Sequence, residues 1–204
     1  MTKLKEYKMF IDGEWLESES KKKFETLNPE NNEPWAAVPE ASTKDVDKAV
    51  KAAQKAFEGK WPKLFPKERA KYLKAIADQL RENAELLGKI ETIDTGKLFK
   101  ETKTQANYIA EYYDYYAGLA DKIEGTVLPI DKPNMQVITT RVPIGVVAAI
   151  IPWNSQMLLT AVKLAPALAM GNTIVIKSSE LAPATLFEFA KLIEKTGIPK
   201  GVVN

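Results

Sequence analysis

Apolar residues recur at helical spacing from residue 42 onward. Ser42 is a good N-cap, Asp45 follows it by three residues, and Gly59 and Pro62 mark the end of a first helix. The residues expected to form its buried face fall on successive turns: Val46, Ala49, Val50, Ala53 and Phe57.

Three more helices are expected before residue 123. One opens at Pro66 and carries an apolar stripe to Leu80, and the next restarts at Asn83 and ends at Gly96. The third spans about residues 101–122. Its tyrosines are candidates for a ligand-stacking platform or for a core and subunit interface, and the absence of interleaved basic residues favours the core and interface. They are Tyr108, Tyr112, Tyr113, Tyr115 and Tyr116.

Two stretches show the signals of paired strands. Residues 9–16 predict a hairpin, because apolar residues flank Asp12-Gly13, a strong two-residue turn signal. Residues 126–130 and 136–141 predict two strands joined by a polar loop, and Pro129 places the first of them at an edge.

The last third of the chain alternates strands and helices. Residues 145–151 are a continuous Gly/Val/Ala/Ile run, typical of a strand buried on both faces of a parallel sheet. Residues 173–177 form a second such run, and residues 201–204 begin a third. Helices over about 157–170 and 183–197 separate them. This order predicts a parallel α/β sheet with right-handed crossovers.

Composition narrows the chemistry. With 29 basic and 27 acidic residues the chain has almost no net charge and therefore no large electrostatic field to attract polyanions. Neither nucleic acid nor a membrane surface is an expected partner. It contains no cysteine and no histidine, which excludes disulfides, thiol catalysis, and the commonest base and metal ligand; no metal site is expected. The first ten residues lack a secretory apolar core, and residues 145–153 are shorter than the roughly 20 needed to span a bilayer. A cytoplasmic protein is therefore expected.

Polar turns follow the first two strands of the predicted sheet. In open parallel sheets, ligands bind at the carboxyl ends of the strands, here residues 152–155 and 177–180. Lys177 would supply charge and Glu180 would accept hydrogen bonds from hydroxyls. The glycine-rich dinucleotide and P-loop patterns are absent. From the residues alone, a nucleotide or anion site and an ordinary polar surface both remain open.

Several segments in collinear order resemble the aldehyde dehydrogenase family. They are residues 10–15, 28–29, 94–97, 141–147, 151–154, 163–173, 177–180 and 197–204. The resemblance implies that the parent protein oxidises an aldehyde to a carboxylic acid with NAD. The implied steps are thiolate attack, hydride transfer and thioester hydrolysis.

The resemblance also implies an organisation in three parts. Residues 1–125 would form the N-terminal hairpin and helices of the cofactor-binding domain. Residues 126–142 would be bridging strands used in oligomer assembly, which implies a homo-oligomer, a dimer or a tetramer. Residues 143–204 would be the first βαβαβ part of a Rossmann-like sheet. The expected fold class is therefore α/β with an extended β arm.

Site roles are carried over position by position. Asn154 resembles the asparagine whose amide helps to form the oxyanion hole, a task that suits an uncharged donor. Lys177 and Glu180 resemble the pair that grips the adenosine ribose; a carboxylate there repels a 2′-phosphate and favours NAD over NADP. The strand end that packs along the cofactor corresponds to Ile150, Ile151, Pro152 and Trp153.

This sequence departs from the family pattern at both turns. Ser155 and Gln156 stand where an aromatic residue and a proline are usual, which opens the substrate tunnel or makes it more polar. Ser178 and Ser179 stand where a proline and a small residue are usual. Ser179 is a further cofactor-binding candidate, and the added hydroxyl beside Glu180 leaves NADP open.

The chain stops within the third strand, so we expect a piece of a longer protein. The family's nucleophilic cysteine and general-base glutamate would lie beyond residue 204. The alternatives are a truncated, non-catalytic protein that binds NAD or a partner subunit, and a structural remnant with neither activity nor ligand.

Overall fold

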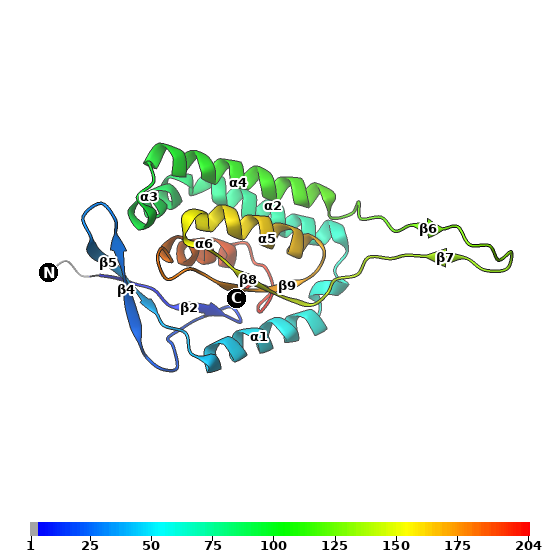
Figure 1. Ribbon diagram of the computed structural model, residues 1–204, viewed down its shortest axis with the longest axis horizontal. Helices are drawn as coiled ribbons and strands as arrows, with labels where there is room; N and C mark the ends of the chain where they lie inside the picture. Colours follow the sequence, from blue (N-terminus) through cyan, green and yellow to red (C-terminus); the bar gives the residue numbers. More distant parts are fainter. Residues whose placement is uncertain (1–3) are drawn as a thin grey trace.

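The computed structural model describes residues 4–204 (Figure 1). The first three residues, part of the segment considered above for a secretory signal, lie outside the described residues. The chain opens with short strands, continues through helices, and closes with alternating strands and helices, which agrees with the α/β order expected from the sequence.

Five short strands form two small sheets at the N-terminus. β2 (Met9–Ile11) and β3 (Glu14–Leu16) pair antiparallel as the expected hairpin, with Asp12 and Gly13 at φ 52° and 71°. Both turn residues therefore have the positive φ that the tightest hairpin turns require. The second sheet has β5 (Glu33–Pro39) at its centre, parallel to β1 (Lys5–Glu6) and antiparallel to β4 (Lys23–Asn28).

The helices surround the closing strands in layers (Figure 1). α5 packs against the strands on one face, and α1 lies on the other, while α2 and α4 pack outside α5. The main core contains Trp61, whose indole N–H donates to the Asn172 carbonyl at 2.8 Å. The helices are α1 (Thr43–Glu58), η1 (Trp61–Lys63), α2 (Pro66–Glu82), α3 (Ala84–Thr95), α4 (Phe99–Leu119), η2 (Trp153–Ser155), α5 (Gln156–Ala169) and α6 (Ala184–Lys195).

The predicted bounds of α1 are confirmed, but the predicted buried face is partly wrong. Val46 and Val50 are 49% and 42% exposed, whereas Asp45, Ala49, Ala52 and Ala53 are buried. The small alanines let the backbone of another segment approach closely: a Cβ added at Gly201 would lie 2.6 Å from the Ala52 carbonyl oxygen. Close packing here selects alanines over the larger valines of the adjacent stripe.

Two parallel strands carry the predicted site. β8 (Val146–Ile150) and β9 (Thr173–Lys177) pair in register from Val146 opposite Thr173 to Ile150 opposite Lys177. Val203 bridges to Ile174 in parallel, so the third strand begins where the sequence placed it.

The expectation that β8 is buried on both faces is wrong. Ala149 is buried, but Ala148 is exposed and Ile150 is 72% exposed. Among the described residues β8 pairs with β9 alone, so it is an edge strand. A run of apolar residues shows that a strand could be buried. It does not show whether neighbouring strands or helices cover it.

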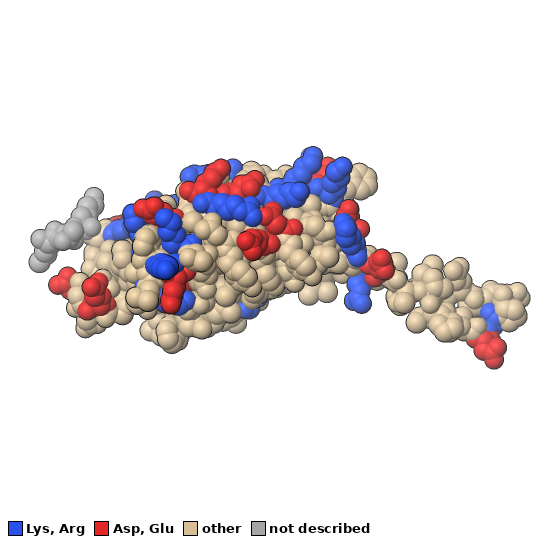
Figure 2. Space-filling view, turned by 90° about the horizontal axis from the view of Figure 1, so that it is seen from above, with Lys and Arg blue, Asp and Glu red and all other residues tan. Residues whose placement is uncertain are grey.

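β6 (Val127–Leu128) and β7 (Val137–Ile138) form an antiparallel hairpin that projects from the body (Figure 1). Val127 and Ile138 are each 62% exposed. Figure 2 shows charge on this projection mainly at its tip, whereas basic and acidic side chains mix over the body. Within residues 4–204 no helix is long and apolar enough to cross a membrane.

Asp94 joins three elements through its buried carboxylate. Thr26 of β4 donates its hydroxyl to Oδ1 at 2.8 Å, and the Ala184 N–H at the start of α6 donates to Oδ2 at 2.7 Å. These bonds favour the ionised form, but burial outweighs them and raises the pKa of Asp94 from 3.8 to about 6.

We expect Asp94→Asn to destabilise the protein, and the stability gap from wild type to widen as pH falls from about 7 to about 4. An amide places a donor against a buried donor, which costs about 1–3 kcal/mol. The wild-type folded state also binds a proton at higher pH than the unfolded state, so its stability rises relative to the variant as the pH falls toward 3.8.

Urea denaturation at several pH values measures this gap. Asp78→Asn, at an exposed carboxylate, is the matched control and is expected to stay within about 0.5 kcal/mol of wild type. A gap that is constant or that narrows toward acid pH would contradict the assignment.

Candidate functional site

The carboxyl ends of β8 and β9 bring the two predicted turns to one edge of the sheet. The Ile151 N–H donates to the Lys177 carbonyl at 3.0 Å, so the strands remain paired up to their last residues. The chain after β8 then enters η2, and the chain after β9 turns through residues 178–183 toward α6.

A buried glutamine links the two turns. Gln156, the first residue of α5, is completely buried, and its side-chain amide donates to the Ala182 carbonyl. Ser179 is also buried, and its hydroxyl accepts from the Leu181 N–H at 3.2 Å. The second turn is thereby stabilised internally and tied to the start of α5.

Most predicted residues of the first turn are accessible. Pro152 and Asn154 are exposed, Trp153 is 53% exposed, and Ile150 lies open just before them. Ile151 differs, because its side chain is 2% exposed and belongs to the main core. A ligand at this edge would therefore contact Ile150 and Trp153 but not the Ile151 side chain.

Lys177 and Glu180 form an exposed ion pair at the second turn. Lys177 Nζ lies 3.1 Å from Glu180 Oε2, with both side chains more than 60% exposed. The backbone N–H of Glu180 and then the Lys177 ammonium hold the pKa of Glu180 below its ordinary value. Glu180 is therefore a carboxylate at neutral pH, able only to accept hydrogen bonds.

Lys97 lies beside the predicted site, although no sequence pattern placed it there. It follows Gly96, which ends α3 with φ 76°. Its Nζ donates to Ser155 Oγ at 2.6 Å and to Glu91 Oε1 at 3.4 Å. The only signal in the sequence was the segment 94–97, which carries the family resemblance without indicating a contact 58 residues away.

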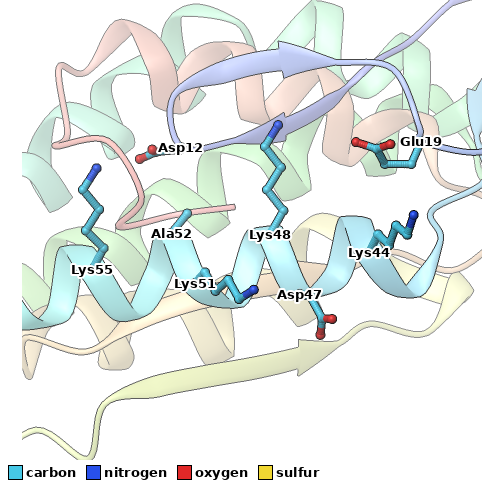
Figure 3. Close-up of a pocket in the computed structure, with 8 residues that line it drawn as sticks. All are labelled: Asp12, Glu19, Lys44, Asp47, Lys48, Lys51, Ala52 and Lys55. Carbon is cyan, nitrogen blue, oxygen red and sulfur yellow. The ribbon is translucent and has the colours of Figure 1, made fainter.

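A surface hollow lies away from this edge. Figure 3 shows it between α1 and the β2–β3 hairpin, with Lys44, Lys48, Lys51 and Lys55 projecting from α1. None of the predicted cofactor residues lines it. The described part of the chain also has no group of three or more acidic side chains arranged to hold a metal ion.

The arrangement at the sheet edge offers groups that could contact a ligand, but it has no thiol nucleophile. It offers an amide at Asn154, a carboxylate paired with an ammonium, and exposed apolar surface. The chain has no cysteine or histidine. Such an edge suits a ligand with hydroxyl groups and flat apolar parts.

Comparisons with known proteins show which family this chain resembles. The sequence model described as the aldehyde dehydrogenase family matches residues 15–204. A (Z)-2-((N-methylformamido)methylene)-5-hydroxybutyrolactone dehydrogenase from Acinetobacter baylyi is 50% identical over 98% of this chain and 41% of its own length. A betaine aldehyde dehydrogenase from Bacillus subtilis is 44% identical over 96% of this chain and 40% of its own.

Solved structures show the same similarity. A crystal structure of betaine aldehyde dehydrogenase from Staphylococcus aureus in complex with NAD+ superposes with a TM-score of 0.93 at 39% identity, covering 97% of this chain and 39% of that one. The chain thus spans about 40% of the length of the curated relatives it matches. Because the family model matches nearly its whole length, the chain belongs to the aldehyde dehydrogenase family.

Proposed function

We propose that this chain is the cofactor-binding portion of an NAD-dependent enzyme that oxidises an aldehyde to a carboxylic acid. The observation that carries the proposal is the placement of Asn154 and the Lys177–Glu180 pair at one edge of a parallel sheet. The thiol nucleophile and the general base would come from residues outside 1–204. The proposed enzyme is cytoplasmic.

NAD fits the residues at this edge. Its ribose hydroxyls are donors, and Glu180 is an exposed carboxylate acceptor. Lys177 is close enough to share the same hydroxyls, and Ile150 and Trp153 offer exposed apolar surface along the strand ends. A 2′-phosphate would place negative charge beside Glu180, so NAD is favoured over NADP.

Buried residues support this cofactor site indirectly. Ser179 stabilises the turn that presents Glu180 by accepting from the Leu181 N–H. Ile151 anchors the strand end in the core, while its neighbour Pro152 directs the chain into η2. In the proposed site, these residues hold the backbone against which the cofactor packs.

Asn154 is the proposed oxyanion donor. When bound, NAD would supply the hydride acceptor for the oxidation. The Asn154 amide would donate a hydrogen bond to the aldehyde oxygen as negative charge develops on it, and the amide neither gives up nor takes a proton. Asn154 is exposed in η2, just after β8, which leaves the donor free to meet a substrate.

The proposed organisation keeps the three parts inferred from the sequence: 1–125, the arm at 126–142, and a Rossmann-like part at 143–204. The arm would pack on a second copy of the protein in a dimer or tetramer. Its exposed apolar residues and its projection from the body support this role (Figure 1). Burying Val127 and Ile138 on assembly would remove apolar surface from water.

We expect Glu180→Gln and Lys177→Met each to weaken NAD+ binding by about 10-fold or more. Hydrogen bonds to charged groups contribute roughly 1.5–3 kcal/mol. Isothermal titration calorimetry measures the affinity, and Glu111→Gln, at an exposed carboxylate on α4, is the control. Glu180→Gln is also expected to narrow the preference for NAD+ over NADP+.

Three outcomes of this titration separate the competing functions. Binding that is weakened by these variants, in a protein that oxidises aldehydes, supports the proposal. Binding without aldehyde oxidation supports the alternative of a non-catalytic NAD-binding protein. The absence of any binding heat with NAD+ at high protein concentration would contradict both the proposed enzyme and the non-catalytic NAD-binding protein.

For the arm, we expect Ile138→Asp to weaken self-association at least 10-fold. A charge in the contact would lose the apolar contribution of the side chain, about 1.5–3 kcal/mol for full burial, and would also cost desolvation. Sedimentation velocity over a concentration series measures the change. Val46→Asp places the same charge at an exposed position on α1 and is expected to leave assembly unchanged. Equal association of the two variants would contradict the assignment.

A further inference from the structure

Ser155 occupies a helix-capping position without acting as a cap. It is the N-cap residue of α5, where a serine hydroxyl ordinarily accepts a backbone N–H from the first turn. Its side chain makes no such bond. Instead, Ser155 Oγ accepts from Lys97 Nζ at 2.6 Å, a contact between residues 58 apart in the chain.

Lys97 is fixed by a buried carboxylate. Glu91 Oε1 lies 3.4 Å from Lys97 Nζ, and the Glu91 side chain is completely inaccessible, while that of Lys97 is 28% exposed. Glu91 Oε2 has no hydrogen-bond partner among the described residues. Lys97 is therefore the polar neighbour that compensates Glu91, and its ammonium is held between that carboxylate and Ser155.

This geometry determines which way the Ser155 hydroxyl acts. A lysine ammonium has donors and no acceptor, so Ser155 Oγ must accept in this contact. The hydroxyl hydrogen of Ser155 therefore remains available to a hydrogen-bond acceptor other than Lys97. A hydroxyl polarised by a cation is also a stronger donor, because hydrogen bonds in a chain reinforce one another.

We propose that Lys97 and Ser155 form a specificity-determining pair that selects aldehydes with a hydrogen-bond-accepting oxygen near the reacting carbonyl. The inference rests on the proposed function, in which Asn154 meets the aldehyde oxygen. Ser155 is the next residue, with its Cα about 3.8 Å away. Ser155 touches the substrate, and Lys97 is a positioning residue that acts through it.

Hydrocarbon aldehydes are disfavoured for a physical reason. An alkyl group packed against Ser155 would remove water from the hydroxyl without providing an acceptor. A site built to hydrogen-bond a substrate group discriminates strongly against an analogue that lacks it, because the polar group of the site is then left unpaired.

The test compares two aldehydes of similar shape in the complete protein that contains this chain. 4-Oxobutanamide carries an acceptor oxygen, and 4-methylpentanal replaces its amide with an isopropyl group. We expect wild type to prefer the amide by about 10-fold or more in kcat/KM, the ratio for one hydrogen bond of roughly 1.4 kcal/mol or more.

Variants assign the preference to the pair. Ser155→Ala is expected to reduce the ratio of kcat/KM for the amide to kcat/KM for 4-methylpentanal about 10-fold, because the variant loses the bond to the amide oxygen and no longer leaves a hydroxyl unpaired beside the isopropyl group. Lys97→Met is expected to reduce the same ratio, because the Ser155 hydroxyl loses the cation that orients it. Ser155→Thr retains the hydroxyl and is expected to retain the preference. Lys100→Met, at a nearby exposed lysine, is the control.

The outcomes distinguish failure of this inference from failure of the proposed function. NAD+ titration and oxidation of 4-methylpentanal report the function, whereas the ratio between the two aldehydes reports the pair. An active enzyme with no preference for the amide, or variants that slow both aldehydes equally, would overturn the inference alone. A protein that binds no NAD+ and oxidises neither aldehyde would overturn both.

Discussion

The parallel pairing of β8 and β9 is the constraint on which the site depends. Ile150 stands opposite Lys177, so both strands end at one edge and both following turns emerge there. A slip of one residue would displace one turn by about 3.3 Å relative to the other and reverse which face each side chain occupies. Gln156 opposes such a slip, because its buried amide bonds the carbonyl of Ala182 across the two turns.

A second constraint brings the helical layer to the same edge. Asp94 is anchored by Thr26 of β4 and by the N-terminus of α6, and Gly96 then turns the chain out of α3. Lys97 lies three residues after this anchor and reaches Ser155. The accessible site thus depends on buried polar contacts that hold three distant segments in place.

Local signals predicted the elements and their order. Ser42 and Asp45 form the capping box at the start of α1, and Asp12-Gly13 forms the turn of the β2–β3 hairpin. Gly96 ends α3 in the left-handed conformation that glycine favours. Such signals act within a few residues of the chain. They succeed where the local conformation decides the structure.

Burial and long-range contacts were not predictable in the same way. Val46 and Val50 fit a helical stripe as well as the alanines do, but the alanine face is the buried one, and Gly201 packs closely against the backbone at Ala52. Ile150 was expected inside and lies at an exposed strand end. The contact between Lys97 and Ser155 depends on how α3 meets the sheet, for which the sequence of either segment alone carries no signal.

A crystal structure of the protein with NAD+ bound tests the central claim most directly. We predict ribose hydroxyls within hydrogen-bonding distance of Glu180 in the turn after β9, with the nicotinamide end of the cofactor extending toward the turn that holds Asn154. Adenosine bound away from this edge, for example in the lysine-lined hollow beside α1, would contradict the account.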